Sequence, residues 1–156
     1  MQISLVAVGR KAPAWINEGF ESYRKRITTP CRLQLIEVES VRRTPALNTS
    51  KMLSLEADRI RAALPKGARV IALDERGREF STRDLAGRIA EWANMGQDVA
   101  CVIGGADGLE REFIAAADET WSLSCMTLPH ALARVLLAEQ IYRACSILMN
   151  HPYHRE

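Results

Sequence analysis

The sequence predicts an α/β fold in which a mostly parallel sheet is flanked by helices. Short apolar stretches rich in β-branched residues alternate with longer segments of helical periodicity throughout the 156 residues. Residues 98–103 contain the continuous apolar run Val-Ala-Cys-Val-Ile, which is typical of a strand buried on both faces. Strands that alternate with helices in this way favour parallel pairing. The length is that of one domain, and we expect a single domain over residues 1–156.

The first quarter of the chain is expected to hold two strands and one helix. Gln2–Val8 is a β-branched and apolar run ended by Gly9, which fits a buried strand. Pro13 is expected to open a helix to about Arg26, because apolar and aromatic residues recur there every three or four positions. Leu33–Val38 has the composition of a second strand.

The middle of the chain begins with a polar segment, Ser40–Ser50, which holds turn-forming residues and two arginines. It predicts an exposed loop able to move over a site. The elements expected after it are a helix over 51–64 capped by Ser50, a strand over 69–73, a turn over 74–78, a helix from the capping pair Ser81 and Asp84 to about Met95, and the strand over 98–103.

The last third is expected to contain a short helix over 110–117, a strand beginning at Trp121 and a helix from Pro129 to about Met149. The apolar residues of this last helix cover more than one stripe, so a single core contact does not account for them. We therefore expect a second subunit to cover part of the helix. The face expected to join the two subunits consists of Leu132, Leu136 and Ile141.

The composition excludes several classes of protein. Hydrophobic residues make up 47% and charged residues 26%, which is unlike a disordered chain. No apolar run is long enough to cross a membrane, and the start lacks the pattern of a signal peptide, so a cytoplasmic location is expected. The four cysteines lie far apart, without a neighbouring cysteine or a histidine at zinc-like spacing. We expect reduced cysteines and no metal site.

Basic residues concentrate near the start of the chain, although the net charge is only +2. Residues 1–45 carry eight basic and four acidic side chains, whereas residues 74–119 carry five and eleven. The basic side chains could follow a phosphate backbone or form an ordinary solvated face. Those considered for RNA contact are Arg24, Lys25, Arg26, Arg42 and Arg43.

A ligand site is expected where the third, fourth and fifth strands end, because ligands of parallel α/β sheets bind beyond the carboxyl ends of strands. Gly104 and Gly105 follow the fourth strand and permit close approach of the backbone to a ligand. Residues 122–128 alternate apolar side chains with hydroxyls, which suits a pocket. Three ordinary turns are the alternative. No dinucleotide, phosphate-loop, zinc-protease or serine-nucleophile motif is present.

The end of the chain, His151-Pro152-Tyr153-His154-Arg155, gathers side chains that bind or move protons. A solvated terminus is the alternative interpretation.

Five motifs in order give the sequence a resemblance to a known family. They are V-I-G-G-A-D-G-L at 102–109, W-S-L-S at 121–124, T-L-P-H at 127–130, R-V-L-L-A-E-Q-I-Y-R-A at 134–144 and N-H-P-Y-H-R at 150–155. Together they resemble the SPOUT-class ribosomal RNA large-subunit methyltransferase H family, whose members methylate N3 of a pseudouridine in 23S rRNA. The likeness covers essentially the whole chain.

The resemblance implies a homodimer of α/β-knot subunits, each with a C-terminal trefoil knot that holds S-adenosyl-L-methionine. Elementary rules of chain topology would instead predict an unknotted fold. The cofactor pocket implied by the resemblance consists of Leu73, Gly104, Gly105, Leu123, Ser124, Cys125, Met126, Thr127 and Leu128. The partners implied are a second copy of the chain and 23S rRNA in the ribosome, with no membrane and no metal. The last helix would then pack against the partner subunit.

The candidates for the chemistry of methyl transfer are His154, Tyr153, Arg143, Glu139 and Arg155. His154 is the preferred base or proton relay, since an ordinary imidazole titrates at about pH 6.5. Tyr153 suits stacking or hydrogen bonding to a base. Glu139 and Arg143 lie four residues apart on one helix face and either orient the substrate or form a surface ion pair. The main alternative function is that of a non-catalytic RNA-binding protein. A thiol redox enzyme is not supported, because no cysteine has a neighbouring cysteine that could resolve an oxidised thiol.

Overall fold

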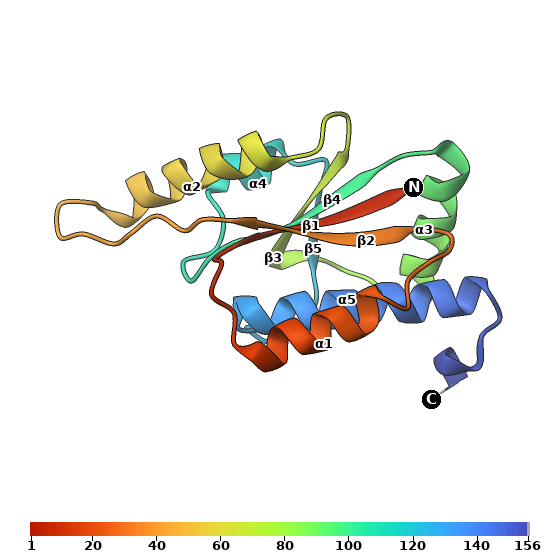
Figure 1. Ribbon diagram of the computed structural model, residues 1–156. Helices are drawn as coiled ribbons and strands as arrows, with labels where there is room; N and C mark the ends of the chain where they lie inside the picture. Colours follow the sequence, from red (N-terminus) through yellow and green to blue (C-terminus); the bar gives the residue numbers. More distant parts are fainter. Residues whose placement is uncertain (156) are drawn as a thin grey trace.

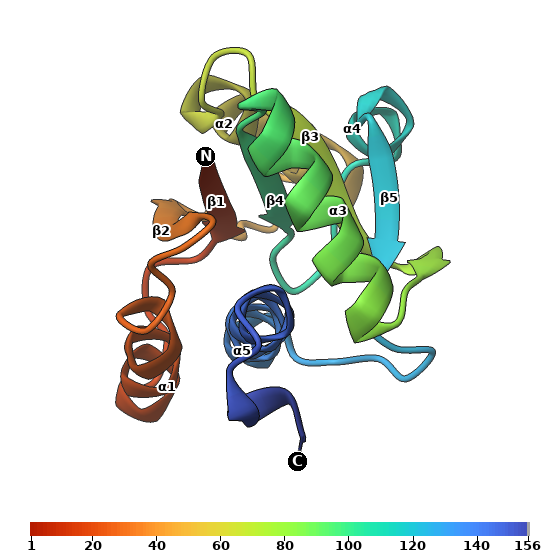
Figure 2. The ribbon, with the colours of Figure 1, turned by 90° about the vertical axis from the view of Figure 1, so that its right-hand side faces the viewer.

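The computed structural model describes residues 1–155, except for the side chain of His154. A twisted sheet runs through the molecule, with helices on both of its faces (Figure 1). Figure 2 shows α2 and α4 on one side of the sheet and α1, α3 and α5 on the other. None of the helices in the described part of the chain has the length and apolar character needed to cross a lipid bilayer.

The sheet has five parallel strands in the order β2-β1-β4-β3-β5. This confirms the predicted α/β class with a parallel sheet. The strands are β1 (Gln2–Val8), β2 (Arg32–Val38), β3 (Arg69–Glu79), β4 (Val99–Ile103) and β5 (Glu119–Ser122). The trefoil knot that the family resemblance implies stays a prediction.

The helices connect the strands and close the chain. They are α1 (Ala14–Arg24), α2 (Thr49–Ala63), α3 (Thr82–Met95), α4 (Arg111–Ala116) and α5 (His130–Leu148), followed by the 3₁₀ turn η1 (Pro152–Arg155). The capping box predicted for α3 is present, since the Ser81 hydroxyl accepts from Asp84 N and the Asp84 carboxylate accepts from Ser81 N. The cap of α2 is Asn48 and not Ser50, which lies in the first turn.

Alternate residues of the central strands build a core on each face of the sheet, as the two-residue period of a strand requires. On β4, Val99, Cys101 and Ile103 pack towards α1, α3 and α5, whereas Ala100 and Val102 pack towards α2 and α4. All five are buried, so the prediction of a strand covered on both faces is confirmed.

Most of the apolar surface of α5 is covered within its own chain. The helix lies between α1 and α3 against the sheet (Figure 2). Leu137, Ala138 and Ile141 are at most 1% exposed. The prediction that Ile141 lies on a free face for a second subunit is therefore wrong, while Leu132 and Leu136 remain partly exposed. The surplus of apolar residues reflects three intramolecular neighbours: the sheet, α1 and α3.

The third strand is longer than predicted. Residues 74–78, expected to turn the chain, continue β3 to Glu79 beyond an irregularity at which both Leu73 and Arg78 oppose Trp121. A side chain at Gly77 would lie 2.4 Å from the backbone carbon of Trp121. Glycine is needed here because the two strands approach closely. The extension carries acidic side chains past the end of the sheet towards the residues that follow β5.

Candidate functional site

A cavity of 1280 Å³ opens where β3, β4 and β5 end. Its walls come from three segments far apart in the sequence: residues 73–76, residues 103–109 and residues 122–130, with contributions from α2, α4 and the start of α5. This is the position at which parallel α/β sheets bind ligands. The strand-end rule therefore placed the cavity correctly from the sequence.

Residues 104–108 after β4, which we call the glycine turn, form a closely packed part of the cavity wall. A side-chain carbon at Gly104 would lie 2.3 Å from the carbonyl oxygen of Gly108, a backbone atom. At Gly105 it would meet a Val8 methyl group at 3.3 Å and a Glu56 carboxylate oxygen at 3.5 Å. Gly105 and Gly108 close the turn through a backbone hydrogen bond of 3.1 Å. The backbone of this turn is thus packed too closely for a side chain at Gly104.

The extension of β3 holds the segment after β5 in place. Thr127 Oγ1 donates to a carboxylate oxygen of Glu75 at 2.7 Å, and Cys125 Sγ donates to Glu79 at 3.2 Å. The hydroxyl of Ser124 accepts from Met126 N at 2.9 Å. These contacts explain how a segment without regular structure keeps a defined path along the cavity. The Glu79 carboxylate raises the pKa of the Cys125 thiol, which therefore stays protonated.

The residues predicted for the cofactor pocket gather around one cavity, with one exception. The residues that line it are Leu73, Gly104, Gly105, Leu123, Ser124, Met126, Thr127 and Leu128. Cys125 does not line the cavity, because its side chain is directed to Glu79. Lining residues that the sequence interpretation missed are Asp74, Glu75, Arg76, Asp107, Arg111 and His130. Asp74 and Glu75 directly follow the predicted third strand, so the strand-end rule could have placed them in the cavity wall, but their composition is typical of a turn.

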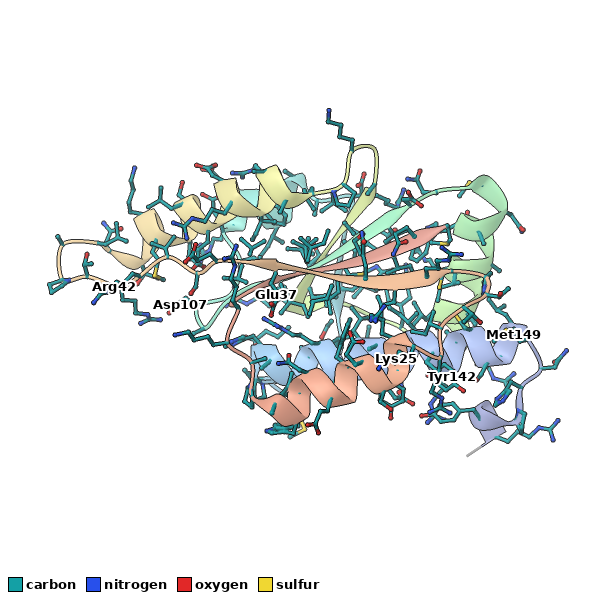
Figure 3. The ribbon with its side chains drawn as sticks, in the orientation of Figure 1. Lys25, Glu37, Arg42, Asp107, Tyr142 and Met149 are labelled. Carbon is teal, nitrogen blue, oxygen red and sulfur yellow. The ribbon has the colours of Figure 1, made fainter. Side chains whose placement is uncertain are left out.

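The exposed loop after β2 is tied to the glycine turn. Val41 N donates to the buried carboxylate of Glu56 at 3.0 Å, and Arg43 forms an ion pair with Asp107, a residue of the cavity wall. Figure 3 shows Arg42 and Asp107 at the same end of the molecule. The loop predicted to move over a site therefore lies beside the cavity, and the contacts that hold it include the Arg43–Asp107 ion pair and hydrogen bonds to side chains of α2.

Four of the candidates for the chemistry lie on α5 or just after it: Glu139 at the middle of the helix, Arg143 one turn later, and Tyr153 and Arg155 in η1. The Tyr153 hydroxyl donates to Glu139 Oε1 at 3.2 Å, and Arg143 Nε donates to the same oxygen at 2.8 Å. Arg155 is exposed. The side chain of His154, the preferred base, lies outside the described residues. The structure thus brings Glu139, Arg143 and Tyr153 into one hydrogen-bonded group, which we call the tail cluster.

Tyr153 is held as a neutral phenol. Burial raises the pKa of its hydroxyl, and hydrogen bonding with Tyr23 and the nearby Glu139 carboxylate raise this pKa further. Its ring packs against Tyr142 with 4.6 Å between ring centroids. The hydroxyl can therefore donate a hydrogen bond at neutral pH but is unsuited to removing a proton.

The tail cluster lies farther along α5 than the cavity does, from the middle of the helix towards its C-terminal end. The cavity includes His130, the first residue of the helix, whereas η1 follows its last turn. A 19-residue helix is about 28 Å long. Figure 3 shows the same separation, with Asp107 at one end of the molecule and Tyr142 and Met149 towards the other. Within one chain, Glu139 and Arg143 lie about 14 and 20 Å along the helix from His130, so we do not expect this cluster to contact a ligand in the cavity of the same chain.

Among the described residues, no group of three or more histidine, cysteine or acidic side chains is arranged to hold a metal ion. The polar side chains that line the cavity include the carboxylates of Asp74, Glu75 and Asp107, the guanidinium groups of Arg76 and Arg111 and the imidazole of His130.

Comparison with known proteins gives a consistent result. Residues 1–154 match the family described as "Predicted SPOUT methyltransferase". The curated relatives include the "Ribosomal RNA large subunit methyltransferase H" proteins of Janthinobacterium sp. (strain Marseille) and Burkholderia ambifaria (strain MC40-6). They are 52% and 50% identical over 155 residues, which cover 99% of this chain and 99% of each relative.

Solved structures resemble the fold at much lower sequence identity. A probable methyltransferase from Bordetella pertussis Tohama I superposes with a TM-score of 0.59 at 16% identity and covers 92% of this chain and 95% of that one. A probable methylase family protein from Haemophilus influenzae Rd KW20 gives 0.58 at 17% identity, over 97% and 69% of the two chains. These likenesses concern the fold alone.

Proposed function

This chain belongs to the SPOUT methyltransferase family, and from that premise we propose that it methylates ribosomal RNA of the large subunit with S-adenosyl-L-methionine as methyl donor. The finer target is N3 of a pseudouridine in 23S rRNA. Relatives at 50–52% identity over 99% of the chain, all named for large-subunit rRNA methylation, support the substrate class. The observation that carries the proposal is the single cavity where the three predicted loops meet. An enzyme acting on ribosomes works in the cytoplasm.

The cavity fits the proposed methyl donor. Ligand pockets typically enclose about 300–1000 Å³, and 1280 Å³ leaves room for a substrate base beside the donor. The apolar wall formed by Leu73, Leu123 and Leu128 suits an adenine ring, and the Gly104–Gly105 backbone permits close approach. Carboxylates of Asp74, Glu75 and Asp107 suit the positive charges of the donor, while Arg111 suits its carboxylate.

The donor supplies a methyl group on a positively charged sulfur, which makes it a good electrophile without help from a metal. The residues of the chain must then align the ring nitrogen and assist its deprotonation. We assign the proton transfer to His154 and substrate hydrogen bonding to Tyr153, oriented by Glu139 and Arg143. Arg155, exposed beside them, completes the set as a contact to the substrate.

The two halves of this site must come from two chains. Glu139 and Arg143 of the tail cluster lie about 14 and 20 Å along α5 from His130 in the wall of their own cavity. We infer a homodimer in which the tail of one chain reaches the cavity of the other. Leu132 and Leu136, partly exposed at the cavity end of α5, are available for the contact, together with Trp15, which is 60% exposed. Two-fold symmetry then builds two equal sites.

Binding of the donor is tested by calorimetry on the intact protein. We expect binding of S-adenosyl-L-methionine at one site per chain, and transfer of labelled methyl from it to large ribosomal subunits that lack the modification. A non-catalytic RNA-binding protein would bind the subunits but neither bind the donor nor transfer methyl. Absence of donor binding would therefore overturn the proposed function.

The two-chain site is tested by mixing inactive variants. Gly104→Ala damages the cavity and leaves the tail, whereas truncation after Asn150 removes the tail and leaves the cavity. A refolded equimolar mixture should regain about a quarter of wild-type activity, because roughly half of the dimers are mixed and each has one intact site. Each variant refolded alone is the control. A mixture as inactive as its components would contradict the shared site.

A further inference from the structure

Arg26 follows α1 and lies against the turn that carries the tail cluster. Its guanidinium carbon is 4.2 Å from the centroid of the Tyr142 ring and 5.1 Å from that of the Tyr153 ring. The backbone N–H of Arg26 donates to the carbonyl oxygen of Tyr23 at 3.0 Å, which continues the helical path just past α1. The end of α1 is thereby connected to α5 and η1 through one cationic side chain over two aromatic rings.

The sequence alone groups Arg26 with Arg24 and Lys25 as a possible phosphate contact, but the structure separates the three. Arg24 forms two hydrogen bonds of 2.7 Å to the Glu21 carboxylate. Arg26 lies over the tyrosine rings. Lys25 is exposed and forms no ion pair with a carboxylate of the described residues; it lines a hollow beside the end of α1 together with Arg24 and Arg32. Three consecutive basic residues therefore have three different surroundings.

We propose that Arg26 is a positioning residue for methyl transfer, which acts by holding Tyr153 and the η1 turn against α5. The proposal rests on the proposed function, because the turn matters only if it enters a partner's site. A guanidinium over the faces of two tyrosine rings is attracted by their electron-rich π systems. It links Tyr142, which is buried in α5, to Tyr153, which is only partly buried in the terminal turn.

Several contacts hold the turn against α5, and Arg26 adds one that comes from outside that helix. Asn150 adopts a positive φ of 53°, which ends the helical path, and the chain then redirects through η1. The contacts that fix Tyr153 come from α5 residues, through the Glu139 hydrogen bond and the Arg143 guanidinium, which is 4.7 Å from the ring centroid. From α1 and the residues just after it come a hydrogen bond with Tyr23 and the guanidinium of Arg26. Without it, we expect the turn to sample positions in which the tail no longer meets the substrate correctly.

The test compares Arg26→Ala, Arg26→Lys and Lys25→Ala, with large ribosomal subunits lacking the modification as substrate and saturating methyl donor. We expect Arg26→Ala to lower kcat about tenfold with little change in KM, since a positioning role affects the transition state more than binding. Arg26→Lys should restore part of kcat, because an ammonium group also binds an aromatic face. Lys25→Ala should instead raise KM and flatten the salt dependence of binding.

A second measurement follows the turn directly. With 3-fluorotyrosine in place of Tyr153, the fluorine resonance should move towards that of free fluorotyrosine in Arg26→Ala and stay near the wild-type position in Lys25→Ala. A raised KM with unchanged kcat and an unmoved resonance would make Arg26 a phosphate contact and overturn the proposal, as would no change in any parameter. If the wild-type protein did not bind the methyl donor, this would instead refute the proposed function.

Discussion

Replacing Gly104 with alanine tests the glycine turn most sharply. The new methyl group would lie 2.3 Å from Gly108 O and 2.4 Å from Gly108 C, both backbone atoms. Ordinary van der Waals contact begins at 3.4 Å, so the turn must move by about 1 Å. Overpacking of this kind costs about 1–3 kcal/mol. The turn forms a wall of the cavity, so we expect affinity for the methyl donor to fall at least tenfold, since about 1.4 kcal/mol is a factor of ten.

Calorimetric titration with the donor measures this affinity, and urea unfolding measures the accompanying loss of stability. Gly105→Ala serves as the graded comparison, because its methyl group meets side-chain atoms at 3.3 and 3.5 Å that can shift slightly; we expect a loss of affinity of about threefold or less. Gly87→Ala on α3 is the neutral control, with no atom within 4 Å of the added carbon. It should raise stability by about 0.5–1 kcal/mol and leave affinity unchanged. A folded Gly104→Ala protein that binds the donor as tightly as wild type would refute the argument.

Three further variants extend the tests. Truncation after Asn150 should abolish methyl transfer while calorimetry finds donor affinity within about twofold of wild type, because η1 lies far from the cavity; full turnover would show the tail to be only a terminus. Arg134→Met should lower the free energy of unfolding in urea by about 3 kcal/mol, because it removes the ion pair of a buried arginine with the partly exposed Glu37 and leaves the carbonyls of Val8 and Gly9 without this donor; a loss below about 1 kcal/mol would contradict this. Burial alone would raise the pKa of Glu119, but hydrogen bonds and nearby arginines lower it overall. Its contribution to stability is therefore present above its unfolded pKa near 4.5 and lost as pH falls through the lower folded value, so Glu119→Gln should flatten the acid limb of the stability profile.

The fold could be predicted where local signals agree with the final packing. The run over Val99–Ile103 is apolar at every position because both faces of β4 are covered, and this follows from the sequence directly. The cap of α3 could also be predicted, because the Ser81 hydroxyl and the Asp84 carboxylate are three residues apart, the spacing at which they accept hydrogen bonds from the first free N–H groups of a helix. The cavity followed from a general rule about strand ends and from glycines in the right place.

Elsewhere, contacts distant in sequence override the local pattern. Asp74-Glu75-Arg76-Gly77-Arg78 reads as a turn, yet pairing with β5 extends β3 through it. Arg134 appeared to be an ordinary polar residue of α5. Its guanidinium is in fact 2% exposed in the core and donates to the carbonyls of Val8 and Gly9 at the end of β1. No periodicity in the sequence predicts that a charged residue on a helix will be paired with carbonyls 125 or 126 positions away.

Different contacts hold the two parts of α5, the part beside the cavity and the part beside the tail. Arg134 fixes the start of the helix to the end of β1, beside the cavity, while Tyr142 and Arg26 fix its far end to α1 and the tail. Arg134 and Tyr142 are eight residues apart on α5, which is about 12 Å along the helix, and they contact different elements, so we expect a change at one of them to leave the contacts of the other in place. We therefore expect donor affinity to depend on the glycine turn and the β3 extension, and methyl transfer to depend in addition on the tail. A variant that changes only one of these properties identifies the end of α5 at which its residue acts.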